Sequence, residues 1–325
     1  MIKHPDRTGF TYDTLFEQYT ALNLPTNLLG QDRDFTIFNL NDLKRTYPFQ
    51  IPVSRLNFFI FIFVKNGWGY HKVDDISYKI EPGTVYITNP GHWRSFDWHH
   101  ADHVCLITLS ESFLKENIHN EIFNEFPFLL SQTFLGKKIE DANFSEFELL
   151  YKQIKSTHLA KSAYRKRMVG SLFVVLLLKI KEHFFECFNV SNESDRSSAI
   201  VSNFKILLEK HYRDLATGQS KYLYQIPDYA SKLQLHPNYL NSVIKIKTGR
   251  PISYWMAEKN ITEARSMLIN TNVSIKLIAY RLGFTRPTHF SSFFKRHTGY
   301  SPVEFRARGM SISSPEAKGN PQTML

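Results

Sequence analysis

The sequence has few of the features that mark disulfide-stabilised or membrane proteins. It contains only two cysteines, Cys105 and Cys187, both in apolar surroundings, which favours buried thiols in a reducing compartment. The longest apolar run, Leu172–Leu178, has seven residues, far fewer than the ~20 needed to span a bilayer. No apolar export signal is visible near the first residues. We therefore expect a cytoplasmic protein with no membrane contact.

Motifs of catalysis are also missing. The 14 glycines are scattered, so no glycine-rich nucleotide loop is present, and neither Gly-x-Ser-x-Gly nor Cys-x-x-Cys occurs. We predict that the chain is not an enzyme and requires no cofactor.

The sequence is instead rich in aromatic residues and in positive charge. Its 325 residues include 27 Phe and 16 Tyr, enough for two or three packed domains and too many for a disordered protein. The net charge of +10 is uneven, because residues 199–309 hold 17 Lys and Arg against six Asp and Glu, whereas the remainder is nearly neutral. Such concentration indicates a surface that binds phosphate groups; a solubilising charge run is the alternative.

The most informative stretch, residues 278–306, has the pattern of a helix, a tight turn and a second helix. Ala279 is small where two helices must cross closely, and Gly283 follows the first helix where a left-handed cap is needed. Phe290 and Phe294 belong to an apolar stripe on the second helix, and basic residues lie off that stripe. A DNA major groove can accept a helix with such a polar, basic face.

The same pattern occurs once before in the chain, with matched residues 49, 50 or 51 positions apart. The pairs are Ile226 and Ile275, Ala230 and Ala279, Leu233 and Leu282, Lys245 and Lys295, Thr248 and Thr298, Gly249 and Gly299, Pro251 and Pro302, and Tyr254 and Phe305. Two copies indicate an internal duplication. Duplication within a basic segment favours DNA binding far more strongly than one short helix pair would.

The second copy resembles the DNA-binding domain of the AraC/XylS family of bacterial transcription regulators, and the resemblance extends over about residues 200–309. The residues that fit the family signature are Ile278, Ala279, Leu282, Gly283, Phe284, Phe290, Phe294, Lys295, Gly299, Ser301, Pro302, Phe305 and Arg306. Arg286 and Pro287 depart from it, although Pro287 suits the first turn of a helix. The resemblance implies a sequence-specific regulator with two helix-turn-helix units joined by a long helix, here Pro251–Ile269. It also implies double-stranded DNA and RNA polymerase as partners.

The residues predicted to face DNA lie on two recognition helices. In the first, about Pro237–Lys247, Leu240, Val243 and Ile244 should pack inward. The predicted DNA contacts are Asn238, Asn241, Ser242, Lys245, Arg286, Thr288, Ser291, Ser292 and Lys295. Asn pairs well with adenine, and Lys or Arg with guanine or phosphate. Matched to the family's positions, the base readers are Asn238, Asn241, Ser242, Thr288 and Ser292.

Residues 35–110 have the pattern of a small β-rich domain. A buried strand is predicted at Asn57–Val64, and further strands at Thr84–Thr88 and Val104–Leu109. Turns are predicted at Asn66-Gly67 with Gly69, at Glu81–Gly83 and at Asn89–Gly91. This spacing suggests a sandwich or barrel, similar in outline to the cupin-like barrel that often precedes this DNA-binding domain.

Residues 111–188 are predicted to be helical, with helices over Ser112–Glu125, Phe144–His158 and Ser162–Phe188. The third is apolar on nearly every face, which fits either a core helix or a homodimer interface, and the family uses such helices to dimerise. The expected fold is therefore α+β, with a cupin-like β-barrel, following helices and an all-α double helix-turn-helix domain. The predicted domains are a sensory and dimerisation domain (1–188), a linker (189–198), a DNA-binding domain (199–309) and a disordered tail (310–325).

Aromatic and histidine residues cluster in the β-rich part. One interpretation is a pocket for a small-molecule effector, and the residues predicted to bind it are Trp68, His71, Tyr86 and Trp93. A second interpretation is that they only fill the core. A third is a cupin-type metal enzyme fused to a DNA-binding module, with His99 and His103 on one strand face. The metal-cupin order of His and Glu is missing from Gly69–Asp74, so we expect no metal.

Overall fold

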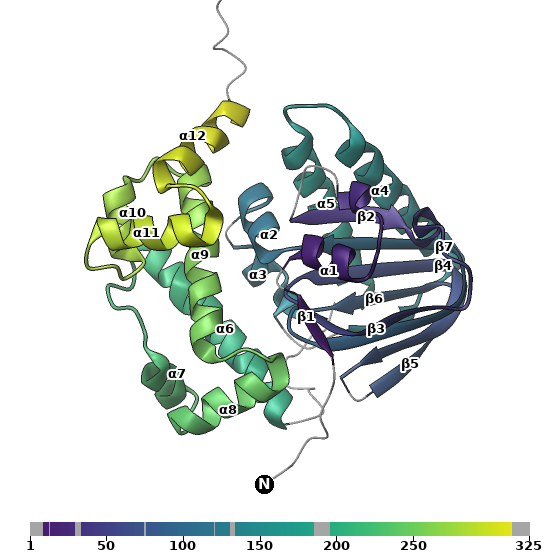
Figure 1. Cartoon of the computed structure of the whole chain (residues 1–325), viewed down its shortest axis with the longest axis horizontal. Helices are drawn as coiled ribbons and strands as arrows, with labels where there is room; N and C mark the ends of the chain where they lie inside the picture. The colour runs from purple at the N-terminus through teal and green to yellow at the C-terminus, as the bar shows by residue number, and fades with distance from the viewer. Residues whose placement is uncertain are drawn as a thin grey trace, which may run out of the picture.

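The computed structural model describes residues 9–12, 14–29, 34–74, 76–119, 121–130, 134–184 and 196–313. A β-sheet with helices packed against it forms the N-terminal part, and the C-terminal part is all helical (Figure 1). The α+β class predicted from the sequence is therefore confirmed. Cys187 and most of the predicted linker lie outside the described residues, as does the chain after Ser313.

The strands are β1 (Phe10–Tyr12), β2 (Phe35–Asn39), β3 (Phe49–Leu56), β4 (Phe59–Val73), β5 (Ile76–Ile80), β6 (Thr84–Thr88), β7 (Trp93–Leu109) and β8 (Phe134–Lys138). The helices of the N-terminal part are α1 (Leu15–Ala21), α2 (Glu111–Asn117), α3 (Ile122–Glu125), α4 (Asp141–Leu159) and α5 (Arg165–Phe184), with short 3₁₀ helices η1 (Thr26–Leu29), η2 (Leu40–Leu43) and η3 (Pro127–Leu129). The remaining helices are α6 (Arg196–Thr217), α7 (Ile226–Lys232), α8 (Pro237–Thr248), α9 (Ile252–Asn270), α10 (Ile275–Arg281), α11 (Pro287–Thr298) and α12 (Pro302–Ser313).

Two long antiparallel strands, β4 and β7, form the centre of the sheet. The described strands make one eight-stranded sheet in the order β1-β3-β7-β4-β6-β8, with β2 added on β7 and β5 on β4. Among these pairings none joins the two end strands, β1 and β8. The structure thus shows a β-sheet region followed by helices.

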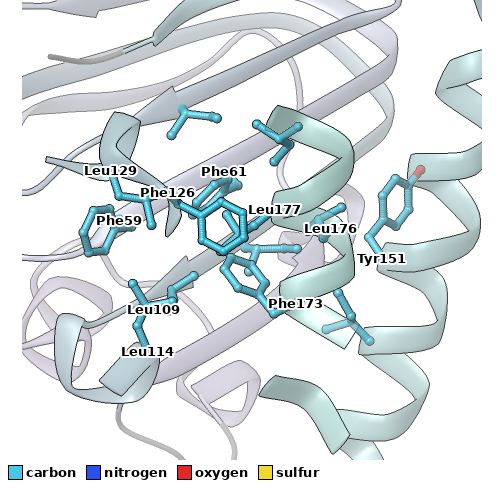
Figure 2. Close-up of a cluster of buried hydrophobic side chains, with 14 of the residues drawn as sticks. Phe59, Phe61, Leu109, Leu114, Phe126, Leu129, Tyr151, Phe173, Leu176 and Leu177 are labelled. Atoms are coloured by element: carbon cyan, nitrogen blue, oxygen red, sulfur yellow. The ribbon is translucent and has the colours of Figure 1, made fainter. Parts of the chain in front are cut away.

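Both faces of the first part of β4, residues 59–64, are buried, which explains the continuous apolar sequence there. Phe59, Phe61 and Phe63 lie in the core that includes α4 and α5, whereas Ile60 and Ile62 lie in a second core on the other face. Figure 2 shows Phe173 and Leu177 of α5 beside Phe59 and Phe61 of the sheet. The Phe61 and Phe173 rings meet edge to face, with centroids 5.2 Å apart.

The turn predicted at Asn66-Gly67 and Gly69 is wrong, because β4 continues to Val73. The glycines lie at irregularities in the pairing of β4 with β7. A Cβ on Gly69 would be 2.2 Å from the Asp97 carbonyl oxygen, and one on Gly67 would be 3.0 Å from that of His100. These glycines permit close approach of two backbones in a bulged strand rather than a reversal of the chain.

The other predicted turns of this domain, at Glu81–Gly83 and Asn89–Gly91, are confirmed, and so is the strand Thr84–Thr88.

The prediction of one continuous helix over Ser112–Glu125 is wrong, because α2 ends at Asn117 and α3 begins at Ile122. At the end of α2, Ile118 has φ −114° and ψ −92°, outside the helical region. The change in direction lets Phe113, Ile122 and Phe123 all enter the core beneath the sheet.

The predicted helix Ser162–Phe188 is present as α5, which begins three residues later, at Arg165, and is described to Phe184. Its buried side includes Phe173, Leu176 and Ile180, each 0% exposed.

None of the helices in the described residues is both long enough and apolar enough to cross a membrane. Cys105 lies in β7 and is buried as a free thiol, as predicted, and its burial raises the pKa of the thiol.

Candidate nucleic-acid interface

Two helix pairs, α7–α8 and α10–α11, lie toward opposite ends of the long helix α9 (Figure 1). Each pair is a short helix, a tight turn and a longer helix. A shared core holds them to α9 and α6, and Leu240, Ile244, Phe290 and Phe294 are 0% exposed within it. The duplicated helix-turn-helix predicted from the sequence is therefore present in the structure.

The close helix crossing predicted in the second unit is confirmed at Ala279 and Gly283. Ala279 is completely buried in the shared core. Gly283 has φ +82°, the left-handed conformation that favours glycine after a helix. A Cβ at Gly283 would also lie 2.7 Å from Leu223, so the turn leaves no room for a side chain.

Both recognition helices begin with proline and end with glycine. Pro237 and Pro287 occupy the first turns, where the missing N–H removes no helical hydrogen bond. At the N-terminus of α8, His236 Nδ1 accepts a bond from the Asn238 N–H (3.3 Å). These signals explain why the predicted bounds of α8 agree with the structure to within one residue.

Most side chains predicted to contact DNA lie on the exposed faces of α8 and α11. The exposed members of that set are Asn238, Ser242, Lys245, Arg286, Thr288, Ser292 and Lys295. Their inward neighbours on α8, Leu240, Val243 and Ile244, are buried as predicted. Arg296 is exposed beside Lys295, which adds a second positive charge near the end of α11.

Asn241 and Ser291 differ from the rest of the predicted set, because both are half-buried and already make contacts within the domain. The side-chain oxygen of Asn241 accepts a bond from the Ile252 N–H (3.0 Å) at the start of α9. The Ser291 hydroxyl donates to the Pro287 carbonyl oxygen (3.0 Å). The side-chain NH2 of Asn241 remains available to donate to a base.

A buried group of charges joins the sheet domain to the helical domain. Lys115 of α2 contacts Glu209 of α6 (2.7 Å) and Glu263 of α9, and Lys259 of α9 contacts Glu209 and also Glu111 (2.5 Å). The side chains of Lys115, Glu209, Lys259 and Glu263 are each at most 4% exposed. We call these four residues the buried ion cluster.

Opposite charge stabilises the ionised carboxylate of Glu209 in this cluster. Burial alone would raise the pKa of Glu209, but Lys115 and Lys259 outweigh burial and hold that pKa below its usual value. Six residues after Lys259 along α9, Arg265 pairs with Asp34 (2.8 Å) and with Glu116. The contact between the two domains therefore follows α9, the helix that connects the two recognition units.

A cavity of about 460 Å³ lies beside the buried ion cluster, between the two domains. Phe58 and Leu130 line it from the sheet domain, and Lys205, Trp255 and Ala257 line it from α6 and α9. Its size suits a small organic ligand. The sequence pattern did not indicate this cavity, because its walls come from segments as far apart in the chain as Phe58 and Trp255.

The four residues predicted to bind an effector do not form one pocket. His71 and Tyr86 are 0% and 3% exposed, and the Tyr86 hydroxyl donates to the Lys79 carbonyl oxygen (2.8 Å). Trp68 is 48% exposed and stacks on His99 (ring centroids 4.6 Å apart). Trp93 is half-buried, with the Arg55 guanidinium 4.2 Å above its ring.

A metal centre was predicted to be absent. Within the described ranges, no three side chains of His, Cys, Asp and Glu come together in a group that could hold a metal ion. His99 and His103 are 35% and 61% exposed, and each lies near an aspartate rather than near further histidines.

Comparison with known proteins gives the class of the helical domain. A family model described as a helix-turn-helix domain matches residues 229–308. The Msm operon regulatory protein of Streptococcus mutans is 30% identical over 139 residues, which cover 43% of this chain and 46% of that protein. The transcriptional activator RhaS of Escherichia coli is 24% identical over 267 residues, which cover 78% of this chain and 87% of RhaS. A solved structure of ToxT from Vibrio cholerae is 14% identical, with 84% of this chain and 98% of ToxT covered and a TM-score of 0.34.

The helical domain is thus a helix-turn-helix domain of the kind found in bacterial transcription regulators. The chain carries a helix-turn-helix domain of the AraC/XylS type over residues 229–308, as its sequence pattern predicts. It spans less than half of the Msm regulatory protein and most of RhaS. The family is one of regulators rather than enzymes.

His71 predicts a pH dependence of the sheet domain. Burial, with a smaller contribution from Arg94, lowers the pKa of His71 from 6.5 to about 3. The unfolded chain binds a proton near pH 6.5 that the folded chain does not, so stability is lost as the pH falls from about 6.5 to 3. Between pH 7 and pH 5, His71→Phe should lose about 2 kcal/mol less stability than the wild type.

The measurement is urea unfolding at the two pH values, followed by tryptophan fluorescence, since Trp68, Trp93 and Trp98 all lie in this domain. Phe should retain the stacking of His71 on Phe96, whose ring lies 4.2 Å away at 7°. The exposed His289 supplies the control His289→Phe, which should keep the wild-type pH slope. Equal losses for the wild type and His71→Phe would show that His71 titrates normally.

Proposed function

We propose that this chain regulates transcription by reading two successive major grooves of double-stranded DNA with α8 and α11, in response to a small-molecule effector. The observation that carries the proposal is the duplicated helix-turn-helix, in which both recognition helices present an exposed polar, basic face. DNA as the ligand implies a cytoplasmic site of action, and RNA polymerase is the further partner expected of such a regulator.

The geometry of the reader follows from α9. A single helix of 19 residues separates the two units and sets the distance between their recognition helices. Helices that enter successive major grooves on one DNA face are about 34 Å apart. The excess of positive charge in residues 199–309 provides the phosphate contacts, which fix the register on DNA but carry no sequence information.

The proposal predicts two distinct kinds of DNA-binding variant. Asn238→Ala should cost about 1–3 kcal/mol in affinity for the target duplex and should relax preference at one base pair, because Asn reads an adenine edge. Lys295→Ala should weaken binding to all sequences alike and reduce the slope of log K against log salt by about one, because Lys neutralises one phosphate.

Both effects can be measured by fluorescence anisotropy across a salt series, with specific and scrambled duplexes. An affinity that is independent of salt would contradict a phosphate-binding surface. Equal losses on specific and scrambled DNA for Asn238→Ala would contradict base reading by α8.

The sheet domain is proposed to be a cupin-like sensory domain, with the cavity beside the buried ion cluster as its effector site. Two features support this position over the aromatic residues predicted from the sequence. The cavity has room for a small molecule, whereas His71 and Tyr86 are packed in a core. A ligand between the domains would also contact α9, so its binding free energy could act directly on the reader.

The effector site can be tested by screening small sugars and carboxylic acids for those that raise the melting temperature of the full chain. Ala257→Trp should abolish the rise, because indole would occupy the cavity, whereas Trp68→Ala should retain it. At 100 times its Kd a ligand stabilises the folded chain by about 2.7 kcal/mol, enough for a clear shift. Loss of the rise in Trp68→Ala alone would move the site to the aromatic surface.

We further propose that the chain forms a homodimer through α5. Tyr164 before the helix and Met168, Val175 and Leu178 within it are 56%, 48%, 42% and 44% exposed, respectively. Their spacing of four, seven and three residues places them on one face, opposite Phe173 and the rest of the buried side. An exposed apolar stripe of this kind is typical of an interface.

The dimer predicts that Val175→Glu combined with Leu178→Glu gives folded monomers, because both positions are exposed in the single chain. The full chain and its variants should be compared by sedimentation velocity at micromolar concentration. Val303→Glu, at a 64% exposed position on α12, is the control and should leave the dimer intact. A monomeric wild type, or a double variant that remains dimeric, would exclude α5 as the interface.

A further inference from the structure

The two recognition helices end in the same way. Gly249 after α8 has φ +76° and Gly299 after α11 has φ +81°. The N–H of Gly249 donates to the Lys245 carbonyl oxygen, and that of Gly299 to the Lys295 carbonyl oxygen, both at 2.8 Å. The two copies therefore share the backbone conformation and the hydrogen bond at the helix end.

The preceding threonines repeat this equivalence. The Thr248 hydroxyl donates to the Ile244 carbonyl oxygen (2.7 Å), and the Thr298 hydroxyl to that of Phe294 (2.8 Å). The two helix ends thus share these hydrogen bonds, and they differ in the side chains at 246–247 and 296–297 and in their surroundings.

Those surroundings differ sharply. A Cβ added to Gly249 would lie 1.5 Å from Nη1 of Arg55, a residue of β3 in the sheet domain. A Cβ added to Gly299 would have no atom within 4 Å. Arg55 is 3% exposed, and its Nη2 donates to the Lys247 carbonyl oxygen (3.2 Å) in the last turn of α8. A cation at this position complements the carbonyl groups that a helix leaves without partners at its C-terminus.

Arg55 is fixed on its other side by the sheet domain. Its guanidinium lies 4.2 Å above the ring of Trp93 in β7. The backbone N–H of Trp93 donates to Oδ1 of Asp74 (3.2 Å), and Oδ2 of Asp74 is 2.8 Å from His92 Nδ1. The position of Arg55 therefore depends on two turns of the sheet domain: the β4–β5 turn, which carries Asp74, and the β6–β7 turn, which carries His92.

A packing contact beside Arg55 connects the same two parts. A Cβ at Gly91, in the turn between β6 and β7, would lie 3.4 Å from both Thr248 and Trp255. Trp255 Nε1 donates to the Thr248 hydroxyl oxygen (2.9 Å). The turn of the sheet domain thus rests against the end of α8 and the start of α9.

We propose that Arg55 is a positioning residue through which the sheet domain sets the orientation of the first recognition helix, α8, and not of the second, α11. A change in the sheet domain would then alter base reading only in the half of the DNA site that contacts α8. This inference rests on the proposed function, in which α8 and α11 read DNA.

The coupling can first be tested without DNA, by hydrogen–deuterium exchange of the full chain. Arg55→Met keeps an unbranched stem but removes the charge and the donors. Exchange in the last turn of α8, 245–249, should rise about three- to tenfold, whereas exchange in the last turn of α11, 295–299, should not change. Arg45→Met, which removes another arginine of the sheet domain, is the control and should change neither helix end. Unchanged exchange at α8 in Arg55→Met would overturn the proposal.

The paired glycines provide a second test that does not alter Arg55. Gly249→Ala and Gly299→Ala impose the same left-handed strain, but only Gly249→Ala displaces the Arg55 guanidinium. Exchange at the α8 end should rise more in Gly249→Ala than exchange at the α11 end does in Gly299→Ala, by a similar three- to tenfold factor. In an Arg55→Met background the two alanine variants should become equivalent. Equivalence in the wild-type background would overturn the proposal.

The effect on reading is measured with duplexes that the wild-type chain enriches from a random library. The base pair whose preference relaxes in Asn238→Ala marks the half of the site read by α8. Arg55→Met should relax preference in that half alone and lower affinity about three- to tenfold. Equal relaxation in both halves, or in neither, would overturn the inference. Failure of the wild type to enrich any duplex would reject the proposed function, and the exchange experiments would still decide whether Arg55 holds α8.

Discussion

The buried ion cluster is the interaction on which the arrangement of this protein depends. Lys115 comes from the sheet domain, Glu209 from α6, and Lys259 and Glu263 from α9. Four charged side chains from three helices are therefore buried together between the two domains. Two lysines balance two glutamates there, and Glu111 adds a partner at the edge. Loss of one partner leaves an uncompensated buried charge, which typically costs about 3–5 kcal/mol. The relative position of the two domains is therefore strongly specified.

Because α9 carries half of this cluster, the sheet domain is fastened to the helix that also sets the separation of α8 and α11. Arg265 and its carboxylate partners extend the contact along α9 toward the second unit. Arg55 extends it toward the first unit, at the end of α8. The cavity lies within this interface, where a ligand would touch both the sheet and α9. The proposed effector site and the recognition helices are thus connected through α9, although they are distant in sequence.

Local sequence patterns predicted the reader well. Proline at the start and glycine at the end delimit α8, and the spacing of Leu240 and Ile244 assigned its buried side. Each of these signals acts within a few residues. The sheet domain was predicted less well because its constraints are long-range. Gly69 has the local pattern of a turn, and only the nearby Asp97 carbonyl group explains it as a close contact.

The position of the candidate effector site likewise depends on contacts between distant segments. Trp68 and His71 were candidates because aromatic and histidine residues cluster in the β-rich part of the sequence. Their exposure, however, depends on which face of the sheet the helices cover. The cavity is formed by Phe58, Leu130 and Trp255, and no pattern within one segment brings these side chains together. Arg55 likewise carries no local signal, since its partner carbonyl group belongs to Lys247, 192 residues away.

The central claim is that α8 and α11 of one chain read successive major grooves. Dimethyl sulfate protection of guanine N7 tests it most directly, because N7 lies in the major groove. The duplex should be one that the full chain enriches from a random library. The account predicts two protected groups of guanines on one DNA face, centred about 10–10.5 base pairs apart for each bound chain. A single protected group, or two groups on opposite faces of the duplex, would contradict it.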